Sequence, residues 1–173
     1  MLFRSPPQLH LIKTVTDDNG GTAQPTAWTL TANGTLASPT NLSGQTPVNS
    51  STTAFKADTY TLGENGGPSG YTAGNWSCVI TGTQTPVTVT SSQVAVGLGQ
   101  DVTCTINNND NPPQLHLIKT VTNDNGGTAQ PSAWTLTANG TLASPTNLSG
   151  QTPVNSSTTT FKADTYTLGE NGG

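Results

Sequence analysis

The sequence predicts an all-β chain of two tandem immunoglobulin-like β-sandwich domains, the second of them truncated. Three observations lead to this prediction. Segment 6–67 recurs as segment 112–173 with only three differing positions, so the chain is a tandem repeat. The period is about 100 residues, which is the size of a sandwich domain and far longer than a solenoid repeat. Short segments also alternate apolar and polar side chains, and clusters of Gly, Pro, Asn and Asp separate them.

The repeat sets the expected domain boundaries. Residues 6–111 form one complete unit, and residues 112–173 form a second copy that stops before any counterpart of residues 68–111. Met1 to Ser5 lack the apolar core of a signal peptide. We therefore expect the chain to be a fragment of a larger gene product.

The composition restricts the class of protein. Charged residues make up 8% of the chain, against about 25% in ordinary soluble domains, and the net charge is −4. A Thr-rich, charge-poor β chain is typical of secreted or cell-surface stalks. The five Lys and Arg residues are scattered and give no electrostatic footprint for nucleic acid. No apolar run is long enough to span a membrane, and no cofactor motif is visible.

The first half of the complete repeat contains two clear strands. Residues 9–15 alternate leucines with polar residues, and the cluster 17–21 (DDNGG) is a turn. Residues 27–32 form the next strand, because their Trp and Leu lie two positions apart and share a face. The long polar stretch that follows is interrupted by Gly and Pro, and we expect only short strands in it, near Leu42 and Val48.

The second half of the complete repeat contains the remaining strands. They are predicted, in chain order, at residues 53–56, 59–62, 76–80, 87–89, 94–96 and 101–108. The strands 87–89 and 94–96 are expected to form a hairpin, and the Gly- and Pro-rich run 66–70 is a loop. Residues 109–113 are a short linker whose prolines stiffen the joint between the domains. No segment has helical periodicity, so the strands predict a sandwich.

The two cysteines, Cys78 and Cys104, fall on separate predicted strands of the complete repeat. In a chain with this surface-like composition they predict a disulfide. On the chain-entropy model, closing that loop stabilises the fold by about 3.5 kcal/mol. The alternative is a pair of reduced core thiols in a cytosolic protein, which the composition disfavours. Two cysteines alone do not make a metal site.

The turn at residues 17–21 has a second interpretation. Asp17, Asp18 and Asn19 supply the oxygen atoms that calcium prefers. The sequence DNGG is more simply explained as turn chemistry, since glycine adopts positive φ without strain. We therefore predict no metal site.

A lysine, a carboxyl group and an amide are expected to face one interior. Lys13 follows two leucines at a period of two, Glu64 follows a tyrosine and a leucine, and Asn108 follows an isoleucine. Burial disfavours the ammonium form, and a neutral amine is a nucleophile. A buried, protonated Glu64 would polarise the amide carbonyl, so that the amine displaces ammonia and forms an isopeptide crosslink. Because this reaction happens once per domain, the chain is not expected to be an enzyme.

Two alternatives to this crosslink remain open at the level of sequence. The Lys13 amine can extend to solvent at a strand edge, with Glu64 as an ordinary surface carboxylate. The acceptor is also not fixed, because Asn107 and Asn109 flank Asn108.

The second copy carries Lys119 and Glu170 at the matching positions but no acceptor strand. That half-domain would need a strand supplied from outside, or the remainder of its gene.

The motifs of the complete repeat resemble those of a known family. These motifs are the L-x-L-x-K opening, Y-x-L-x-E followed by P-x-G-Y, and the closing I-x-N. They are similar to the prealbumin-like, collagen-adhesin B-type domains of Gram-positive pilins and surface adhesins, which include the SpaA-type modules. The turn DDNGG, the W-x-C segment and the run CTINN resemble a cysteine-containing SpaA-like branch. The resemblance implies a prealbumin-like sandwich in which Lys13 is the amine, Asn108 the acceptor and Glu64 the catalytic carboxyl.

We expect a structural repeat module of a bacterial cell-surface or secreted protein, such as an adhesin or a pilin-like stalk. Its expected partners are other repeats of the same polypeptide, and its location is extracellular or on the cell surface. One alternative is an adhesive module whose polar stretch 33–51 binds a host surface protein or a glycan. Another is an accessory domain of a larger secreted enzyme. No nucleic acid partner and no cofactor are expected.

Overall fold

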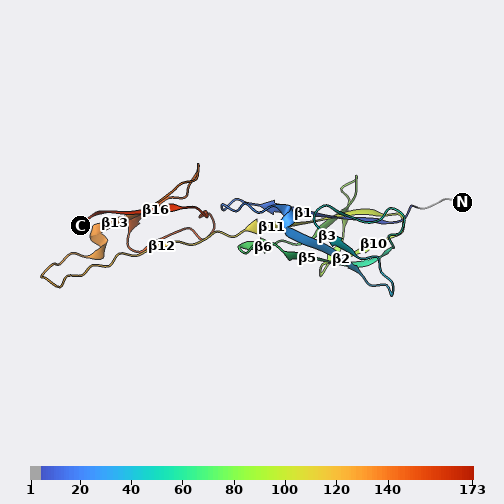
Figure 1. Ribbon diagram of the computed structural model, residues 1–173, viewed down its shortest axis with the longest axis horizontal. Coiled ribbons are helices and arrows are strands. Elements are labelled where there is room, and N and C mark those ends of the chain that lie inside the picture. The colour runs from blue at the N-terminus through green and yellow to red at the C-terminus, as the bar shows by residue number, and fades with distance from the viewer. Residues whose placement is uncertain (1–4) are drawn as a thin grey trace. The chain divides into compact units, whose positions relative to one another are not determined.

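The computed structural model describes residues 5–173, and within them every regular element is a β-strand apart from two single 3₁₀ turns (Figure 1). The all-β prediction is confirmed. The chain divides into two compact units. Unit 1 comprises residues up to 17 together with 22–109, and unit 2 comprises residues 18–21 together with 110–173.

The first sheet of unit 1 is built around its first and last long strands. Strands β1 (Gln8–Thr16) and β11 (Asp101–Asp110) lie side by side and run parallel, from the pair Gln8 and Asp101 to the pair Thr16 and Asn109. The sheet order is β4 (Val48–Asn49), β1, β11, β7 (Ser77–Ile80) and β8 (Pro86–Val87), and β6 (Tyr71–Ala73) also pairs with β11.

The second sheet of unit 1 is antiparallel throughout. Its order is β3 (Leu42–Gly44), β2 (Trp28–Gly34), β5 (Asp58–Gly66), β10 (Gln93–Val96) and β9 (Val89–Thr90). The 3₁₀ turn η1 (Pro25–Ala27) leads directly into β2.

The core of unit 1 lies between these two sheets. It is formed by the inward-facing residue of each alternating pair, as a period of two requires. The first sheet contributes Leu9, Leu11, Cys78, Val102, Cys104 and Ile106, and the second contributes Leu30, Ala32, Tyr60, Leu62, Val94 and Val96. The sandwich architecture that the sequence predicts is therefore confirmed.

The predicted strand at residues 53–56 is wrong. The Ser51 hydroxyl accepts hydrogen bonds from the amides of Thr53 (3.3 Å) and Ala54 (3.2 Å), which closes a turn there. Phe55 is buried and stacks on Tyr60 with ring centroids 4.8 Å apart. Phe55 therefore fills the core from a loop and not from a strand.

The hairpin predicted between residues 87–89 and 94–96 forms, but Val87 does not belong to it. Strand β9 pairs with β10 across a turn at Ser91 and Ser92, which both have positive φ. Val87 belongs to β8, which pairs with β7 in the other sheet. The chain therefore changes sheets between Val87 and Val89.

Unit 2 reproduces the strands of the first part of unit 1. One sheet pairs β12 (His116–Leu117) with β15 (Val154–Asn155), and the other has the order β14 (Leu148–Gln151), β13 (Trp134–Gly140) and β16 (Tyr166–Gly172). The turn η2 (Pro131–Ala133) precedes β13. A small cluster of Leu117, Leu136 and Ala138 forms its core.

The Asp58 carboxylate holds the loop that follows β2. We predict that this contribution to stability is sensitive to acid. Desolvation raises the pKa of Asp58, but hydrogen bonds from the Leu36 amide, the Thr35 hydroxyl and the Thr59 amide outweigh it and leave the pKa below its ordinary value of 3.8. Because the pKa is lower in the folded state, the ionised carboxylate stabilises the fold at pH values above the pKa of the unfolded state. This contribution is lost as the pH falls through the pKa of the folded state. We expect an NMR titration of the Asp58 carboxyl to show a midpoint below 3.8. A midpoint at or above that value would contradict the hydrogen-bonding account, and Asp58→Asn should remove this part of the acid dependence.

Candidate functional site

The candidate site is a buried lysine on β1. Lys13 continues the inward-facing series of Leu9 and Leu11, and its side chain is 0% exposed. Its Nζ atom lies 2.7 Å from Oε2 of Glu64, whose side chain is 13% exposed. Because Lys13 lies in the first sheet and Glu64 in the second, this ion pair crosses the interior of the sandwich. The extension of Lys13 to solvent, which the sequence left open, is therefore wrong.

Asn108 shares this interior. It lies on β11, two residues beyond Ile106, which is the register partner of Lys13 in the parallel pair. Asn108 is 3% exposed, and its Oδ1 atom has no hydrogen-bond partner among residues 5–173. A buried carbonyl oxygen without a donor is energetically costly and requires an explanation.

The two neighbouring asparagines lie outside this interior. The side chain of Asn107 points to the opposite face of β11, where its Oδ1 accepts a hydrogen bond from the Thr14 hydroxyl at 2.9 Å. Asn109 is exposed. Of the three consecutive asparagines, only Asn108 lies on the same face as Lys13.

A buried tryptophan on β2 also covers the lysine. The Lys13 Nζ atom lies 4.8 Å from the centroid of the Trp28 ring, within the range of a cation–π contact. Trp28 in turn meets Tyr71 edge to face, with ring centroids 5.5 Å apart, and the Tyr71 hydroxyl donates a hydrogen bond to the Asp17 carboxylate. The inward position of Trp28 on its strand was readable from the sequence, but its place over Lys13 depends on how the sheets pack.

Gly67 makes room for this tryptophan, and it provides a second prediction. Its φ is +83°, and a Cβ atom there would lie 2.1 Å from Nε1 of Trp28. Gly67→Ala should displace the ring and lower the free energy of unfolding by about 1–3 kcal/mol, measured by denaturant unfolding with Trp fluorescence. The matched control is Gly70→Ala, because Gly70 has a similar φ of +86° but no atom within 4 Å of its Cβ position. Equal losses in the two variants would contradict the steric account.

The cysteine pair is a disulfide, as the sequence predicts. Cys78 on β7 and Cys104 on β11 are direct register partners, with their Cα atoms 4.1 Å apart, and both are buried. The bridge therefore joins neighbouring strands of one sheet. It fixes the strand that carries Asn108 to β7.

The end of β11 corrects the predicted linker. The strand continues through Asn109 to Asp110, so the linker predicted at 109–113 begins too early. Asp110, which the sequence predicts as a linker residue, has a buried carboxylate that accepts hydrogen bonds from the amides of Asn19 (2.9 Å) and Gly21 (2.7 Å). The amide of Asp18 also donates to it, at 3.1 Å. The turn at residues 17–21, which was considered as a calcium site, thus directs backbone N–H groups towards a carboxylate. In the described part of the chain, no group of three His, Cys, Asp or Glu residues could hold a metal ion.

Unit 2 repeats the ion pair in a more open setting. The Lys119 Nζ and Glu170 Oε2 atoms are 2.7 Å apart, but their side chains are 20% and 49% exposed. The Lys119 Nζ atom lies 4.7 Å from the centroid of the Trp134 ring. Lysine, carboxylate and indole therefore come together without the strands that follow β5 in unit 1. In unit 1 the ion pair is more buried, and β11 carries the amide of Asn108.

One comparison with known proteins gives a match. A family model described as a prealbumin-like fold domain of the SpaA type matches residues 4–106 and again residues 110–173. The chain belongs to the SpaA-type prealbumin-like family. This confirms the resemblance that the sequence motifs suggested. Neither the curated proteins nor the solved structures gave a match. Over residues 5–173, the SpaA-type chain has no helix with the length and apolar character needed to cross a membrane.

Proposed function

We propose that this chain is a structural repeat module of a bacterial cell-surface or secreted protein, of the adhesin or pilin-stalk kind. Membership of the SpaA-type family supports a structural role. The Cys78–Cys104 bridge supports an extracellular location, because disulfides persist in oxidising compartments and are rare in the cytosol. Other repeats of the same polypeptide are the partners that such a module would contact.

We further propose that unit 1 crosslinks itself through Lys13 and Asn108. The observation that carries this proposal is the burial of three groups in one interior: an amine, a carboxyl group 2.7 Å from it, and an amide whose oxygen has no donor. A protonated carboxyl group would supply the hydrogen-bond donor that the Asn108 oxygen lacks. The Glu64 carboxyl, held against the amine, is the proposed donor.

The proposed reaction conserves atoms and charge. Lys13 passes one proton to Glu64, which leaves a neutral amine beside a carboxylic acid. The amine nitrogen attacks Cγ of Asn108 while the Glu64 hydroxyl donates a hydrogen bond to Oδ1. An amine proton then moves to the amide nitrogen, the original C–N bond breaks and ammonia leaves. The product is an amide bond between the two side chains, and burial of both groups supplies the proximity that the step requires.

The intact mass of the purified chain tests this proposal. We expect the oxidised chain to weigh about 19 Da less than its sequence, because one ammonia (about 17 Da) and two thiol hydrogens (about 2 Da) are lost. Reduction of the disulfide should restore only about 2 Da and leave a deficit of about 17 Da. Proteolysis should give one linked pair of peptides that contains Lys13 and Asn108.

Three variants serve as controls. After reduction, Glu64→Gln and Asn108→Ala should each have the full calculated mass, whereas Glu170→Gln in unit 2 should keep the deficit of about 17 Da. A parent chain that has its full calculated mass after reduction would refute the crosslink and leave the disulfide as the covalent clamp of the structural module.

A further inference from the structure

The three groups of the proposed crosslink come from two different parts of unit 1. Lys13 and Glu64 lie on β1 and β5, in the first part of the repeat, whereas Asn108 lies on β11, the last strand. Both cysteines also lie after β5, on β7 and β11. The part of unit 1 that carries the acceptor amide is therefore the part that the disulfide joins together.

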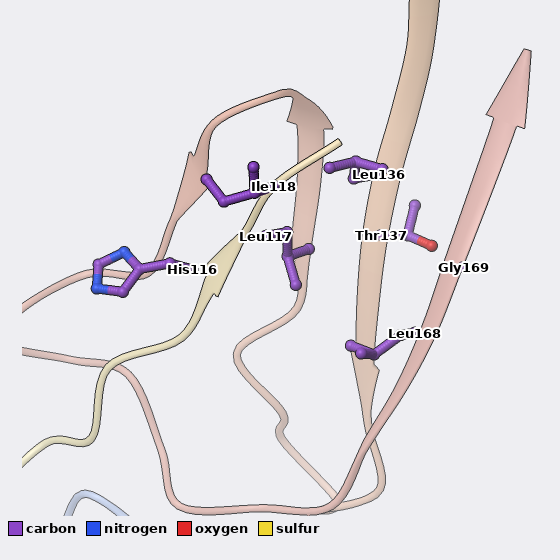
Figure 2. Close-up of a pocket in the computed structure, with 7 residues that line it drawn as sticks. All are labelled: His116, Leu117, Ile118, Leu136, Thr137, Leu168 and Gly169. Carbon is purple, nitrogen blue, oxygen red and sulfur yellow. The ribbon is translucent and has the colours of Figure 1, made fainter. Parts of the chain in front are cut away.

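The amine and the carboxyl group meet without this later part of the repeat. In unit 2, the Nζ atom of Lys119 and the Oε2 atom of Glu170 lie 2.7 Å apart. Figure 2 shows the pocket of about 290 Å³ that Leu136 and Ile118 line in this unit. Leu136 is the register partner of Glu170, and Ile118 directly precedes the lysine. The pairing of lysine and carboxylate therefore does not by itself decide when a crosslink forms.

The acceptor amide is positioned by the two neighbours of β11 in the first sheet, β1 and β7. The parallel pairing with β1 places Ile106 opposite Lys13. The antiparallel pairing with β7 places Cys104 opposite Cys78. Cys104, Ile106 and Asn108 follow one another at a period of two, and all three are buried. A bond at Cys104 therefore restrains the same face of the strand that presents Asn108.

The segment formed by β6 and β7 also closes the site. The Tyr71 ring in β6 meets Trp28 edge to face, and Trp28 covers the amine. Between β6 and β7, the amide of Gly74 donates a hydrogen bond to the carbonyl of Asn107, at 2.8 Å. This segment therefore contacts both the aromatic cover of the amine and the residue beside the acceptor. The disulfide joins it covalently to β11.

We propose that the Cys78–Cys104 disulfide is a redox switch for the crosslink between Lys13 and Asn108, so that the disulfide forms first and the amide bond second. This inference rests on the proposed crosslink. In the reduced chain, β11 is held to its neighbours without a covalent bond, and Asn108 spends less time within reach of the amine. Attack on a carbonyl requires close alignment, and a displacement of about 1 Å can slow such a step about a hundredfold.

Each of the two steps is balanced. In the first step, a small disulfide such as oxidised glutathione takes two electrons and two protons from the two thiols, and it leaves as two thiol molecules. In the second step, the amine displaces ammonia from Asn108 with no change in oxidation state. Oxidant is consumed only by the first step. Any effect of the redox conditions on the second step must therefore act through the structure.

This order would give the crosslink a location. Thiols stay reduced in the cytosol and form disulfides in oxidising compartments outside it. The amide bond, unlike the disulfide, is not reversed by a reductant. A chain of the proposed surface protein would therefore leave the cytosol before its irreversible bond forms at an appreciable rate.

The test follows the mass of the full chain after a short pulse of cell-free synthesis, with either reduced or oxidised glutathione present. All samples are reduced before weighing, so that only the loss of ammonia, about 17 Da, is recorded. With oxidised glutathione we expect this loss to be at least about tenfold faster than with reduced glutathione. Equal rates would overturn the switch and leave the crosslink in place. No loss under either condition would refute the crosslink and the switch together.

A double variant shows whether the disulfide itself sets the rate. Cys78→Ala, Cys104→Ala should lose ammonia at the slow rate with either form of glutathione, because it cannot form the bridge. This expectation holds whether unit 1 is unfolded or only loosened, since β11 lacks its tether in both states. Loss of ammonia from the double variant at the rate of the oxidised parent would contradict the switch.

The order of the two bonds is tested by blocking the crosslink. Asn108→Ala removes the acceptor, whereas Asn107→Ala removes an amide on the opposite face of β11 and keeps the acceptor. With oxidised glutathione, the thiols of both variants should disappear at the same rate, measured by alkylation of the thiols that remain. Slower disulfide formation in Asn108→Ala alone would show that the amide bond forms first and would contradict the proposed order.

Discussion

Replacing Glu64 with glutamine should lower the free energy of unfolding of unit 1 by about 3 kcal/mol. The Lys13 side chain is 0% exposed, and Glu64 is its partner at 2.7 Å. Removing the carboxylate leaves a buried amine without a counter-charge, and an unpaired buried charge is among the most destabilising changes in a core. Glu64→Gln would also block the proposed crosslink, so the two effects act in the same direction.

The measurement is hydrogen exchange in the full chain, read at residues 101–110. That segment occurs once in the sequence and therefore reports on unit 1 alone. The matched control is Glu170→Gln, which breaks the same ion pair where the carboxylate side chain is 49% exposed. Exposed pairs contribute about 0–1 kcal/mol, so this control should change little. The account of a buried pair would be refuted if Glu64→Gln increased the hydrogen-exchange rate at residues 101–110 no more than Glu170→Gln increases it on β16.

Removing the disulfide is the second large change. The double variant Cys78→Ala, Cys104→Ala should lose about 3.5 kcal/mol of unfolding free energy in unit 1, because the unfolded chain regains the entropy of an open loop. Both sulfur atoms belong to buried residues, so the alanines also leave unfilled volume in the core. Denaturant unfolding with Trp fluorescence measures the loss.

Reductant provides the control for this variant. It should lower the denaturation midpoint of the parent chain and leave that of the double variant unchanged. A parent chain that is insensitive to reductant while unfolded and refolded would contradict a stabilising role for the bridge.

Much of the fold was predictable because period-two alternation is a local property. The strands near residues 9–15 and 101–108 were assigned correctly, and so was the inward direction of Lys13 and Asn108. The same rule distinguishes Asn108 from Asn107 once the strand is known to continue, since neighbouring residues face opposite sides. The sequence left that choice open because a run of asparagines also resembles the end of a strand.

What the sequence could not give were features that depend on long-range contacts. A strand is predicted at residues 53–56, but Phe55 fills the core from a loop, where it stacks on Tyr60. Asp110 looked like a linker residue because its partners, the amides of Asn19 and Gly21, lie far away in the sequence. The change of sheet after Val87 likewise depends on which edge each short strand meets.

The parallel pairing of β1 and β11 has a mechanical consequence. The chain enters β1 at Gln8 and leaves β11 at Asp110, which are opposite ends of two adjacent strands that run in the same direction. Tension on the two ends therefore pulls these strands past each other along their length. Every hydrogen bond between them must be strained together in this shearing geometry, whereas a hairpin pulled from one end opens one bond at a time. A tether between Lys13 and Asn108 would cross this same pair of strands and bear the tension directly.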